Sequence, residues 1–514
     1  MKEKCDKILR NIRKNWRENQ FLIKPFLVIL IIYLLGISAI ILVGVHYADD
    51  VARTNYGYAG WSGFSRYLST ILAHGLHADN YLANIAPLPQ ILAAVILALA
   101  SVMLICIVSD KEIFKETWTK WIWRAIAVVP LGLCPYMLEC LSYQYDAVYM
   151  ALSVLFAVWP LLFREKSKFL YTVMIVVGVL VVCMTYQASI GIFPMLVIFV
   201  TMKEWNKRER LQGKKNLMFL VLSAVVFFLT VVVFQKFLMI PRDAYASNVV
   251  PGIGEFLPEF FAHLGQYFAL VVSDFKVLWL VLIGLIGLGF VILFVVESRR
   301  NRMVAILVAL AGVILMAIMA YALYAALDKP LYTTRAMYAI GAFIAILGVY
   351  VVSEISNYNW FIWKIIAIVP VGVLAWCFFV FGFTYGNALG EQNEYRDNQV
   401  NMVISDLNGL ALMEDGGVKI IQTGGQIGFA PVVMHMPEGD YRILRRLLEP
   451  SFGKDVPWMA YKMTQESGMS NLIYRPEVDL ADKNLPKLKD TVFYTIYGDE
   501  EGVLVKFKGE EFDL

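Results

Sequence analysis

The chain has 514 residues, of which 59% are hydrophobic and 17% are charged, and its mean hydropathy is +0.62. Soluble domains carry roughly 25% charged residues, so this composition excludes a wholly soluble protein and predicts that most of the chain lies in a membrane. The first 24 residues hold eight Lys or Arg, whereas the last 129 hold 21 acids and 13 bases, which suggests that the two ends lie on opposite sides of that membrane.

Long apolar runs predict an α-helical polytopic membrane protein with about 11 transmembrane helices, because a span needs roughly 20 mostly apolar residues. The first run begins near Phe21 and is long enough to cross a bilayer. No early apolar h-region with a small-residue cleavage site precedes it, so we interpret it as a retained signal-anchor helix. The predicted helices lie near residues 24–46, 85–108, 124–142, 147–163, 169–185, 189–202, 216–239, 276–296, 303–324, 335–353 and 361–384.

Lys and Arg in the short loops cluster at alternate connections, as the positive-inside rule predicts for cytoplasmic loops. The clusters lie in the N-terminal tail and at residues 111–124, 164–168, 203–215 and 299–302. The N-terminus is therefore expected in the cytoplasm, and an odd number of helices places the C-terminus outside. We expect a basic cytoplasmic tail at residues 1–23, a transmembrane domain at 24–385 and an extracytoplasmic domain at 386–514.

Residues 386–514 differ in character, because charged residues become frequent and the apolar runs shorten to strand length. Val418–Gln422 and Thr491–Tyr497 predict strands, and Asp499–Gly502 predicts a turn. Gly424-Gly425 lacks the GKT or GKS tail of a phosphate-binding loop, so we interpret it as an ordinary loop. We expect a small α+β domain here, and the chain carries no nucleic-acid-binding signature.

The outward loop at residues 47–84 is rich in polar side chains and is the expected catalytic loop. Asp49 and Asp50 are adjacent where the first helix leaves the bilayer, and Arg53 follows one helical turn later. Two neighbouring carboxylates in a low-dielectric setting do not ionise equally, so one can serve as a general base while a cation holds the other. The alternative is that the pair caps a helix or contacts water at the interface.

A second polar cluster is predicted at the outer ends of the third and fourth helices. Glu139, Tyr143, Gln144 and Asp146 follow one another closely there. Acids close to hydrocarbon are costly and usually face a cavity or a partner, so this cluster is a candidate site. Interhelical hydrogen bonds that only fasten the bundle are the alternative.

Two more outward features are candidates for the same site. Tyr186 and Gln187 belong to a tight polar hairpin, although a plain turn would explain it equally. Arg66 and Arg335 are cations near helix ends, where a guanidinium can bind a lipid phosphate, form a salt bridge or reach the interface.

The sequence indicates no cofactor. His74 and His77 are three residues apart, which is a weak metal-site pattern. We interpret them as interfacial histidines on an amphipathic helix, so a divalent metal is compatible with the loop but not indicated.

Several motifs agree with one family in both order and spacing. They are Asp49-Asp50-x-x-Arg53, Gly57-Tyr58-x-Gly60-Trp61 and Ser65-Arg66, then IAPLPQIL at residues 85–92 and the run from Pro135 to Asp146, with a weaker match at Tyr186-Gln187-Ala188-Ser189. This series resembles the bacterial type II glucosyl transferase family, the serotype-converting glucosyltransferases of O-antigens and their Gram-positive relatives. The resemblance is strong over about the first 200 residues and vague afterwards. The C-terminal domain resembles the family only in its position along the chain. Cys140 stands where Asn is expected after the glutamate.

The resemblance implies a GT-C-type membrane glycosyltransferase. Such an enzyme moves a hexose, such as glucose, from a polyprenyl-phosphate donor to a cell-envelope polysaccharide on the outer face of the bacterial plasma (inner) membrane. Asp49 or Asp50 would be the general base, and Arg53, Arg66 and Arg335 would bind the lipid phosphate. Glu139 and Asp146 would bind sugar hydroxyls or hold the arginines in place. The remaining expected substrate-binding residues are Trp61, Tyr143, Gln144, Tyr186 and Gln187.

The expected partners are the lipid-linked sugar donor, the envelope glycan acceptor and membrane lipid, with a flippase and a polyprenyl-phosphate sugar synthase acting before it. A transporter or flippase for lipid-linked sugars is an alternative, although such proteins tend to carry inverted repeats and broken helices, which the sequence does not suggest. A non-catalytic partner in polysaccharide assembly is another. The sequence leaves open which sugar is moved and which polymer accepts it.

Overall fold

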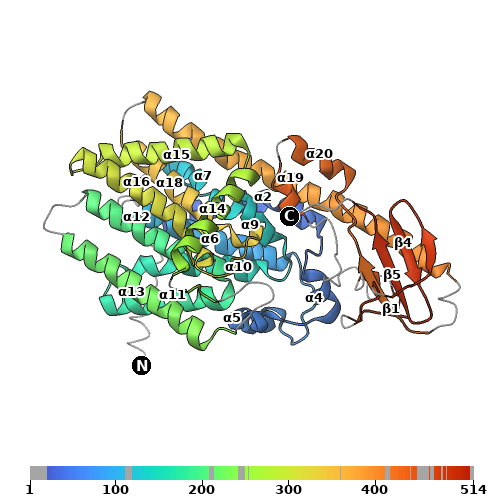
Figure 1. Cartoon of the computed structure of the whole chain (residues 1–514). Coiled ribbons are helices and arrows are strands. Elements are labelled where there is room, and N and C mark those ends of the chain that lie inside the picture. The colour runs from blue at the N-terminus through green and yellow to red at the C-terminus, as the bar shows by residue number, and fades with distance from the viewer. Residues whose placement is uncertain are drawn as a thin grey trace, which may run out of the picture.

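The computed structural model is mostly helical, and a small sheet follows near the C-terminus (Figure 1). Residues 1–19 of the predicted basic tail lie outside the described residues, as do parts of the predicted cytoplasmic loops at 111–124 and 203–215. The structure describes residues 20–109, 118–207, 213–240, 249–252, 254–358, 361–410, 417–439, 441–448, 462–463, 468–469, 471–475, 478–481 and 483–509.

The described helices follow the predicted apolar runs closely for most of the chain. They are α2 (Ile23–Gly36), α3 (Ser38–Val43), α4 (Asp50–Tyr56), α5 (Tyr67–His77), α6 (Leu88–Val108), α7 (Trp118–Ala127), α8 (Pro130–Leu133), α9 (Pro135–Ser142), α10 (Ala147–Val158), α11 (Lys168–Thr185), α12 (Ile192–Lys207), α13 (Gly213–Phe237), α14 (Phe256–Asp274), α15 (Val277–Val296), α16 (Arg302–Met319), α17 (Ala322–Ala325), α18 (Ala339–Ile355), α19 (Phe361–Asn408), α20 (Pro431–Gly439) and α21 (Leu444–Leu447).

Seven of the described helices are long and apolar enough to cross a membrane, and an eighth is added if the bent pair Trp118–Leu133 and Pro135–Ser142 counts as one span. The protein is therefore a membrane protein, but the predicted count of about 11 spans is not confirmed. The pair bends by 60°, where Pro135 begins α9. The predicted helix at 24–46 is divided at Ile37 into α2 and α3.

Hydropathy did not predict α14, which the structure places between the expected helices at 216–239 and 276–296. Its sequence carries Glu259, His263, Gln266 and Asp274 among apolar residues. These polar groups lower the mean hydropathy, although a helix needs only one apolar face to pack. The helix therefore exists without the long apolar run that a span requires.

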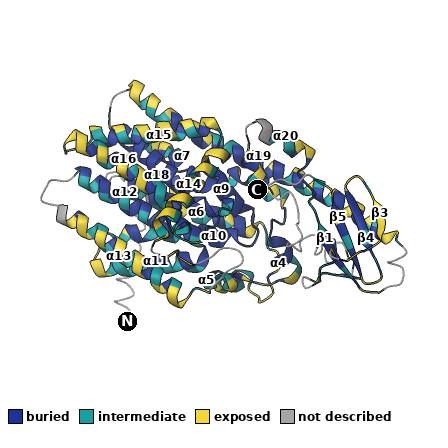
Figure 2. Ribbon diagram, viewed as in Figure 1, coloured by how far each residue is buried: buried dark blue, intermediate teal, exposed yellow. Residues whose placement is uncertain are grey.

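The bundle is built around α18, all of whose 17 residues are buried. Helices α7, α8, α15 and α19 pack against it. The outer helices α13, α15 and α16 instead present apolar side chains such as Leu217, Phe228 and Leu307 to the surroundings (Figure 2). An exposed apolar surface of this extent is the surface expected to face lipid.

Helix α19 connects the bundle with the sheet. It has 48 residues and continues without a break past residue 386, where we placed the start of the C-terminal domain. The last part of the helix packs on the sheet, because Val400, Val403 and Leu407 share a core with sheet residues. The five strands lie in the order β2 (Leu472–Ile473), β1 (Lys419–Gly424), β5 (Gly502–Phe507), β4 (Tyr494–Gly498) and β3 (Lys487–Asp490).

The sheet is mixed, with β1 parallel to both β2 and β5, and β4 antiparallel to β5 and β3. The two predicted strands correspond to β1 and β4, and the predicted turn at Asp499–Gly502 joins β4 to β5 through an Asp499 N–H bond to Gly502 O of 3.0 Å. A small α+β region at the C-terminus is thus confirmed.

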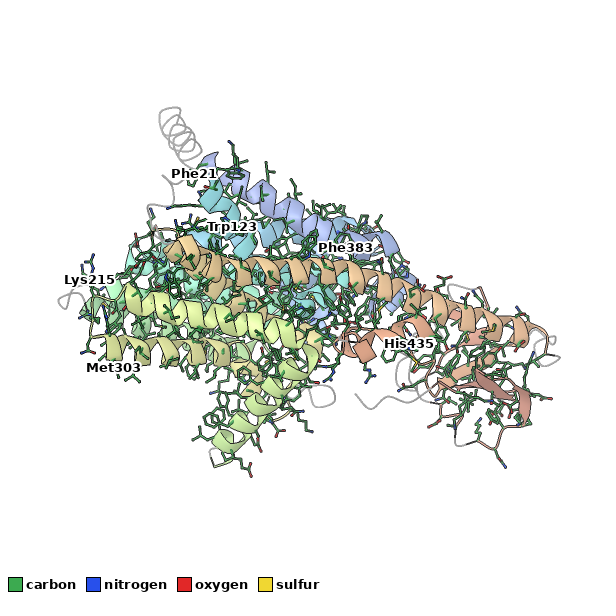
Figure 3. All side chains as sticks on the ribbon, turned by 90° about the horizontal axis from the view of Figure 1, so that it is seen from above. Phe21, Trp123, Lys215, Met303, Phe383 and His435 are labelled. Carbon is green, nitrogen blue, oxygen red and sulfur yellow. The ribbon has the colours of Figure 1, made fainter. Side chains whose placement is uncertain are left out.

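The C-terminal region contributes to two separate cores. The sheet forms one with the end of α19, whereas Phe429, Val433, Ile443 and Leu447 belong to the core of the bundle. Figure 3 shows α20, marked by His435, beside the long helix α19, marked by Phe383. The segment that carries α20 and α21 is therefore packed against the membrane helices rather than the sheet.

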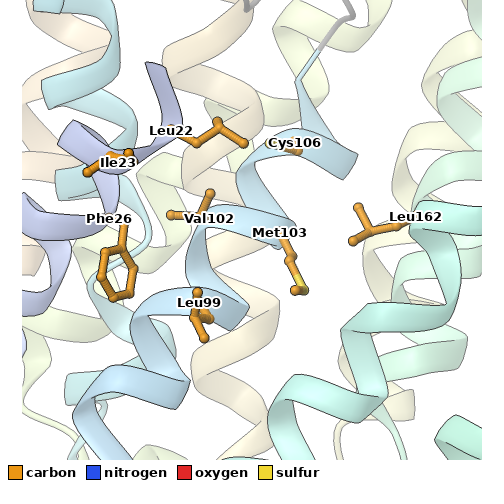
Figure 4. A pocket seen from close by; sticks show the side chains of 8 residues that line it. All are labelled: Leu22, Ile23, Phe26, Leu99, Val102, Met103, Cys106 and Leu162. Atoms are coloured by element: carbon orange, nitrogen blue, oxygen red, sulfur yellow. The ribbon is translucent and has the colours of Figure 1, made fainter. Parts of the chain in front are cut away.

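A cavity of about 480 Å³ lies between α2, α6 and the turn that follows α10 (Figure 4). Its lining side chains are apolar apart from the thiol of Cys106, and they include Phe26, Leu99 and Leu162. The cavity adjoins the second half of α6, whereas the polar residues predicted to form the site adjoin its beginning. It therefore offers room for an acyl chain but no group for chemistry.

Gly382 allows α19 to approach α2 closely. A methyl group at this position would lie 2.1 Å from the carbonyl oxygen of Gly36, so we expect Gly382→Ala to lower the free energy of unfolding by about 1–3 kcal/mol. Gly284→Ala is the matched control, since nothing lies within 4 Å of its added carbon and Ala favours helix over Gly. Thermal unfolding in detergent measures both, and equal melting temperatures would contradict the close packing.

Candidate active site

The twelve predicted site residues all lie in described parts of the chain. They come from the outer loop, helix α9, the turn between α9 and α10, the 186–187 hairpin and the segment before α18. Helix α4, which carries two of them, lies at the end of the bundle nearest the sheet (Figure 1). Hydrogen bonds, ion pairs and ring contacts join these residues into three neighbouring groups.

The first group is centred on Asp50, which is fully buried. Its carboxylate accepts hydrogen bonds from the backbone N–H of Gln144 (2.8 Å), Tyr47 (3.3 Å) and Tyr145 (3.4 Å). Burial raises the pKa of Asp50 well above its ordinary value, against the lowering effect of these donors. Asp50 thus ties the outer loop to the α9–α10 turn.

Asp49 lies beside Asp50 but has a different environment. Its side chain is 47% exposed, and one oxygen lies 3.7 Å from a guanidinium nitrogen of Arg53. The sequence left open which member of the pair can reach a substrate. Exposure now separates them, because Asp49 is accessible and Asp50 is sealed.

Arg53 and Asp146 form a buried ion pair of 2.7 Å, with side chains only 3% and 6% exposed. The indole N–H of Trp61 donates to the other oxygen of Asp146, and the Arg53 guanidinium carbon lies 4.5 Å from the centre of the Trp61 ring. Of the two roles predicted for Asp146, contact with sugar hydroxyls or holding an arginine in place, its geometry agrees with the second. The same burial makes Arg53 and Trp61 parts of a brace, and neither is open to a ligand.

Gln144 is also occupied by the protein itself. Its amide nitrogen donates to the carbonyl oxygens of Gly44 (2.9 Å) and Val45 (3.1 Å), and its amide oxygen accepts from Asn84 (2.6 Å). All three contacts hold the two ends of the outer loop near the α9–α10 turn. The geometry therefore favours a positioning role over the predicted contact with substrate.

The second group contains Glu139 and Arg335, whose ion pair measures 3.4 Å. The hydroxyl of Thr334 donates to the other oxygen of Glu139. Tyr47 connects this group with the first, since its hydroxyl lies 3.5 Å from Glu139 Oε1 while its backbone N–H bonds Asp50. The Tyr143 ring packs edge-on against Tyr47, with ring centres 5.0 Å apart.

The third group contains Arg66, Gln187 and Tyr186. Arg66 Nε donates to Gln187 Oε1 (3.4 Å), and its guanidinium carbon lies 4.4 Å from the centre of the Tyr186 ring. The Tyr186 hydroxyl in turn donates to the backbone oxygen of Arg335 (3.2 Å). A continuous series of contacts therefore leads from Arg66 to the second group.

A second cavity, of about 500 Å³, begins at Arg66 and Gln187 and extends among apolar side chains. It lies between α11, α13, the start of α14 and the loop around α17. Representative lining residues are Ile190, Phe228, Val232, Phe256, Leu323 and Leu331. The cavity has the form of an apolar groove with a cation and an amide at one end.

Sequence reasoning missed four residues of the second group, namely Tyr47, Thr334, Asp274 and Arg446. Arg446 forms an ion pair with Asp274, to which Tyr136 also donates a hydrogen bond of 2.6 Å. Asp274 ends a helix that hydropathy did not predict. The signal for Arg446 was three arginines within five residues of an otherwise acidic domain, but nothing in the sequence places α21 against the bundle.

The outer-loop histidines are engaged with the protein. His74 Nδ1 lies 3.2 Å from the backbone oxygen of Asp79, and His77 stacks on Tyr145 with ring centres 5.8 Å apart. Within the described ranges, no three His, Cys, Asp or Glu side chains are grouped so that they could hold a metal ion.

Comparison with known proteins identifies the family. The sequence model of the family described as glucosyl transferase GtrII matches residues 38–352. The chain belongs to this family. The resemblance drawn from the sequence motifs is thus confirmed, and the matched range contains all twelve predicted site residues.

A protein of Salmonella phage P22, described as an uncharacterized 55.3 kDa protein in the gtrB 5' region, is 25% identical to this member of the GtrII family over 167 residues. The match covers 32% of this chain and 33% of that relative, so the chain spans about a third of the relative's length. No solved structure matches the chain, and the GT-C type of the bundle stays a prediction.

We expect Asp146→Ala to cost about 3–5 kcal/mol of stability, because it leaves the Arg53 charge buried without its closest partner. Glu501→Ala is the control, since it breaks the exposed ion pair with Lys483 and should cost less than about 1 kcal/mol. Thermal unfolding of both variants in the same detergent measures the difference. If the two variants melt together, Asp146 does not brace the loop.

Proposed function

We propose that this protein is an inverting glycosyltransferase that moves glucose or a related hexose from a polyprenyl-phosphate donor to an envelope polysaccharide. Membership in the GtrII family supports sugar transfer. The observation that supports a lipid-linked donor is the apolar cavity that begins at Arg66. A soluble nucleotide sugar would have no use for such a groove, whereas an isoprenoid chain fits it.

The isoprenoid tail occupies the cavity in this proposal, with its phosphate at the polar end. The chain enters the groove from lipid and not from water, so the groove binds it by packing contacts and sets where its phosphate lies. The Arg66 guanidinium lies over the Tyr186 ring, whose hydroxyl donates to the backbone oxygen of Arg335, and in this proposal both arginines bind the phosphate. Arg53 is removed from this role because it is buried against Asp146.

The reaction needs a base for the acceptor hydroxyl. In a single displacement, the hydroxyl oxygen attacks the anomeric carbon while the bond from that carbon to the phosphate oxygen breaks. The proton passes to a carboxylate, and polyprenyl phosphate leaves with the electron pair. Asp49 is the base in this scheme, because it is exposed and lies next to the residues that Asp50 holds in place. The guanidinium groups stabilise the charge on the leaving phosphate.

The outer face of the plasma membrane is the proposed side of the reaction. The positive-inside pattern supports this orientation, and the candidate residues share one end of the bundle with the C-terminal sheet. A donor made in the cytoplasm would then need a polyprenyl-phosphate sugar synthase and a flippase to reach the site. The synthase, the flippase and the envelope glycan acceptor are therefore the proposed partners of this protein.

We expect Asp49→Asn to lower kcat for sugar transfer by roughly 100-fold or more, as loss of a general base does. Donor binding should change little, because the amide keeps the shape of the carboxylate. The measurement is transfer from a panel of polyprenyl-phosphate sugars to purified envelope glycan. Asp79→Asn, an exposed acid of the same outer loop, is the control and should keep full activity.

Two outcomes of that experiment would contradict the proposal. If Asp49→Asn transfers sugar as fast as the wild type, Asp49 is not the base. If the wild type uses no donor of the panel, the transferase function itself is wrong for these substrates, and a transport or assembly role takes its place.

We expect Val232→Trp to raise the KM for a full-length polyprenyl donor by roughly tenfold, since filling the cavity removes about 1.4 kcal/mol of packing contacts with the chain. The KM for a donor with a single isoprene unit should stay unchanged. Val221→Trp on the same helix, which is exposed and does not line the cavity, is the control. Equal effects on long and short donors would place the tail elsewhere.

A further inference from the structure

The segment that carries α21 brings an arginine from the C-terminal region into the second group of the site. Arg446 forms an ion pair with Asp274 and donates to the backbone oxygen of Tyr332. Its own backbone oxygen lies 3.4 Å from the Thr334 hydroxyl. Arg446 therefore packs against the short stretch of chain that also carries Arg335.

Three arginines in this region pair with buried acids, but the arginines themselves differ in how far their side chains are exposed. Arg53 and Asp146 are both sealed, at 3% and 6%. Glu139 and Asp274 are sealed as well, at 3% each, but their partners Arg335 and Arg446 are 25% and 19% exposed. In these two pairs the acid is buried, while the arginine side chain is partly exposed.

The guanidinium of Arg446 keeps donors for a further ligand. It offers five N–H groups in a planar fork. Asp274 accepts from Nη1, while the Tyr332 backbone oxygen and Met337 Sδ accept from Nη2, so the Nε–H and the second Nη1 N–H are left for a ligand. Glu139 lies within electrostatic reach of both Arg335 and Arg446, so both cations lie near one buried carboxylate. Two partly exposed arginines near each other can bind a phosphate oxyanion through their planar forks of donors.

Contacts other than those of Arg446 hold the segment in place. The Tyr47 hydroxyl donates to Leu447 O (2.8 Å). The Tyr441 ring lies 5.7 Å from that of Phe381, with the Lys276 ammonium 3.3 Å from its centre. Gln392 accepts from Ala430 N (2.8 Å) at the start of the segment. Replacement of Arg446 should therefore leave the segment docked.

We propose that Arg446 binds the phosphate of the lipid-linked donor together with Arg335, so that the C-terminal region completes the active site. This inference rests on the proposed function, because it assumes a phosphate-bearing donor. It also gives residues 429–448 a role in donor recognition that is distinct from that of the sheet.

The test compares two variants that break the same ion pair in opposite ways. Arg446→Ala removes the cation, whereas Asp274→Asn keeps the cation and removes its partner charge. We expect Arg446→Ala to lower kcat/KM for the polyprenyl-phosphate sugar by roughly 10- to 100-fold, the size of a lost hydrogen bond between charged groups. Asp274→Asn should cause a smaller loss than Arg446→Ala, because the cation stays while the charge that anchors it is lost. Arg445→Ala, an exposed neighbour on α21, is the matched control and should have no effect.

Direct binding of the donor to the purified full-length variants separates the possible results. Equal losses of binding in Arg446→Ala and Asp274→Asn would overturn the proposal, because the ion pair would then be only a latch for the segment. Unchanged binding in Arg446→Ala would also overturn it. Arg446→Lys keeps the charge without the fork and should give an intermediate loss, so it replaces the alanine variant if that protein fails to fold. If the wild type binds no polyprenyl-phosphate sugar, the proposed function fails and not this assignment alone.

Discussion

The arrangement of the site depends on one buried carboxylate. Asp50 accepts three backbone hydrogen bonds that come from both sides of the site, from Tyr47 in the outer loop and from the turn that follows α9. Three donors on one carboxylate offset part of the cost of taking the group out of water. Because Tyr47 is fixed at its backbone, its hydroxyl can meet Glu139 and the end of α21. The reachable Asp49 is positioned by its sealed neighbour.

Around Asp50, three acids pair with three arginines. In one pair both side chains are buried, and in the other two the acid is buried while the arginine is partly exposed. A buried charge without a partner costs several kcal/mol, so Asp146, Glu139 and Asp274 each hold an arginine. The sealed pair stiffens the outer loop, and the other two pairs place partly exposed arginines where α9, the segment before α18 and α21 meet. The apolar cavity beside Arg66 approaches the same place from the bundle surface.

Much of the fold followed from the sequence because burial in lipid leaves a strong, local signal. Long apolar runs predicted α6, α11, α13 and α15 within a few residues, and the family resemblance was correct. Hydropathy did not predict elements whose packing does not depend on a long apolar run. Helix α14 carries too many polar residues to be recognised as apolar, and the bend before α9 is visible only in three dimensions. The strands β1 and β4 were predicted from short apolar runs, but their order in the sheet was not.

The sequence by itself determined that this is a helical membrane protein of the GtrII family, and it named the acids and arginines that converge at one end of the bundle. It could not decide which of Asp49 and Asp50 is exposed, since adjacent residues share every composition and spacing signal. Nor could it show that Arg446 reaches Asp274, 172 residues away along the chain. Both were decided by tertiary packing, because exposure and pairing depend on which elements meet, and those contacts join segments that carry no common local pattern.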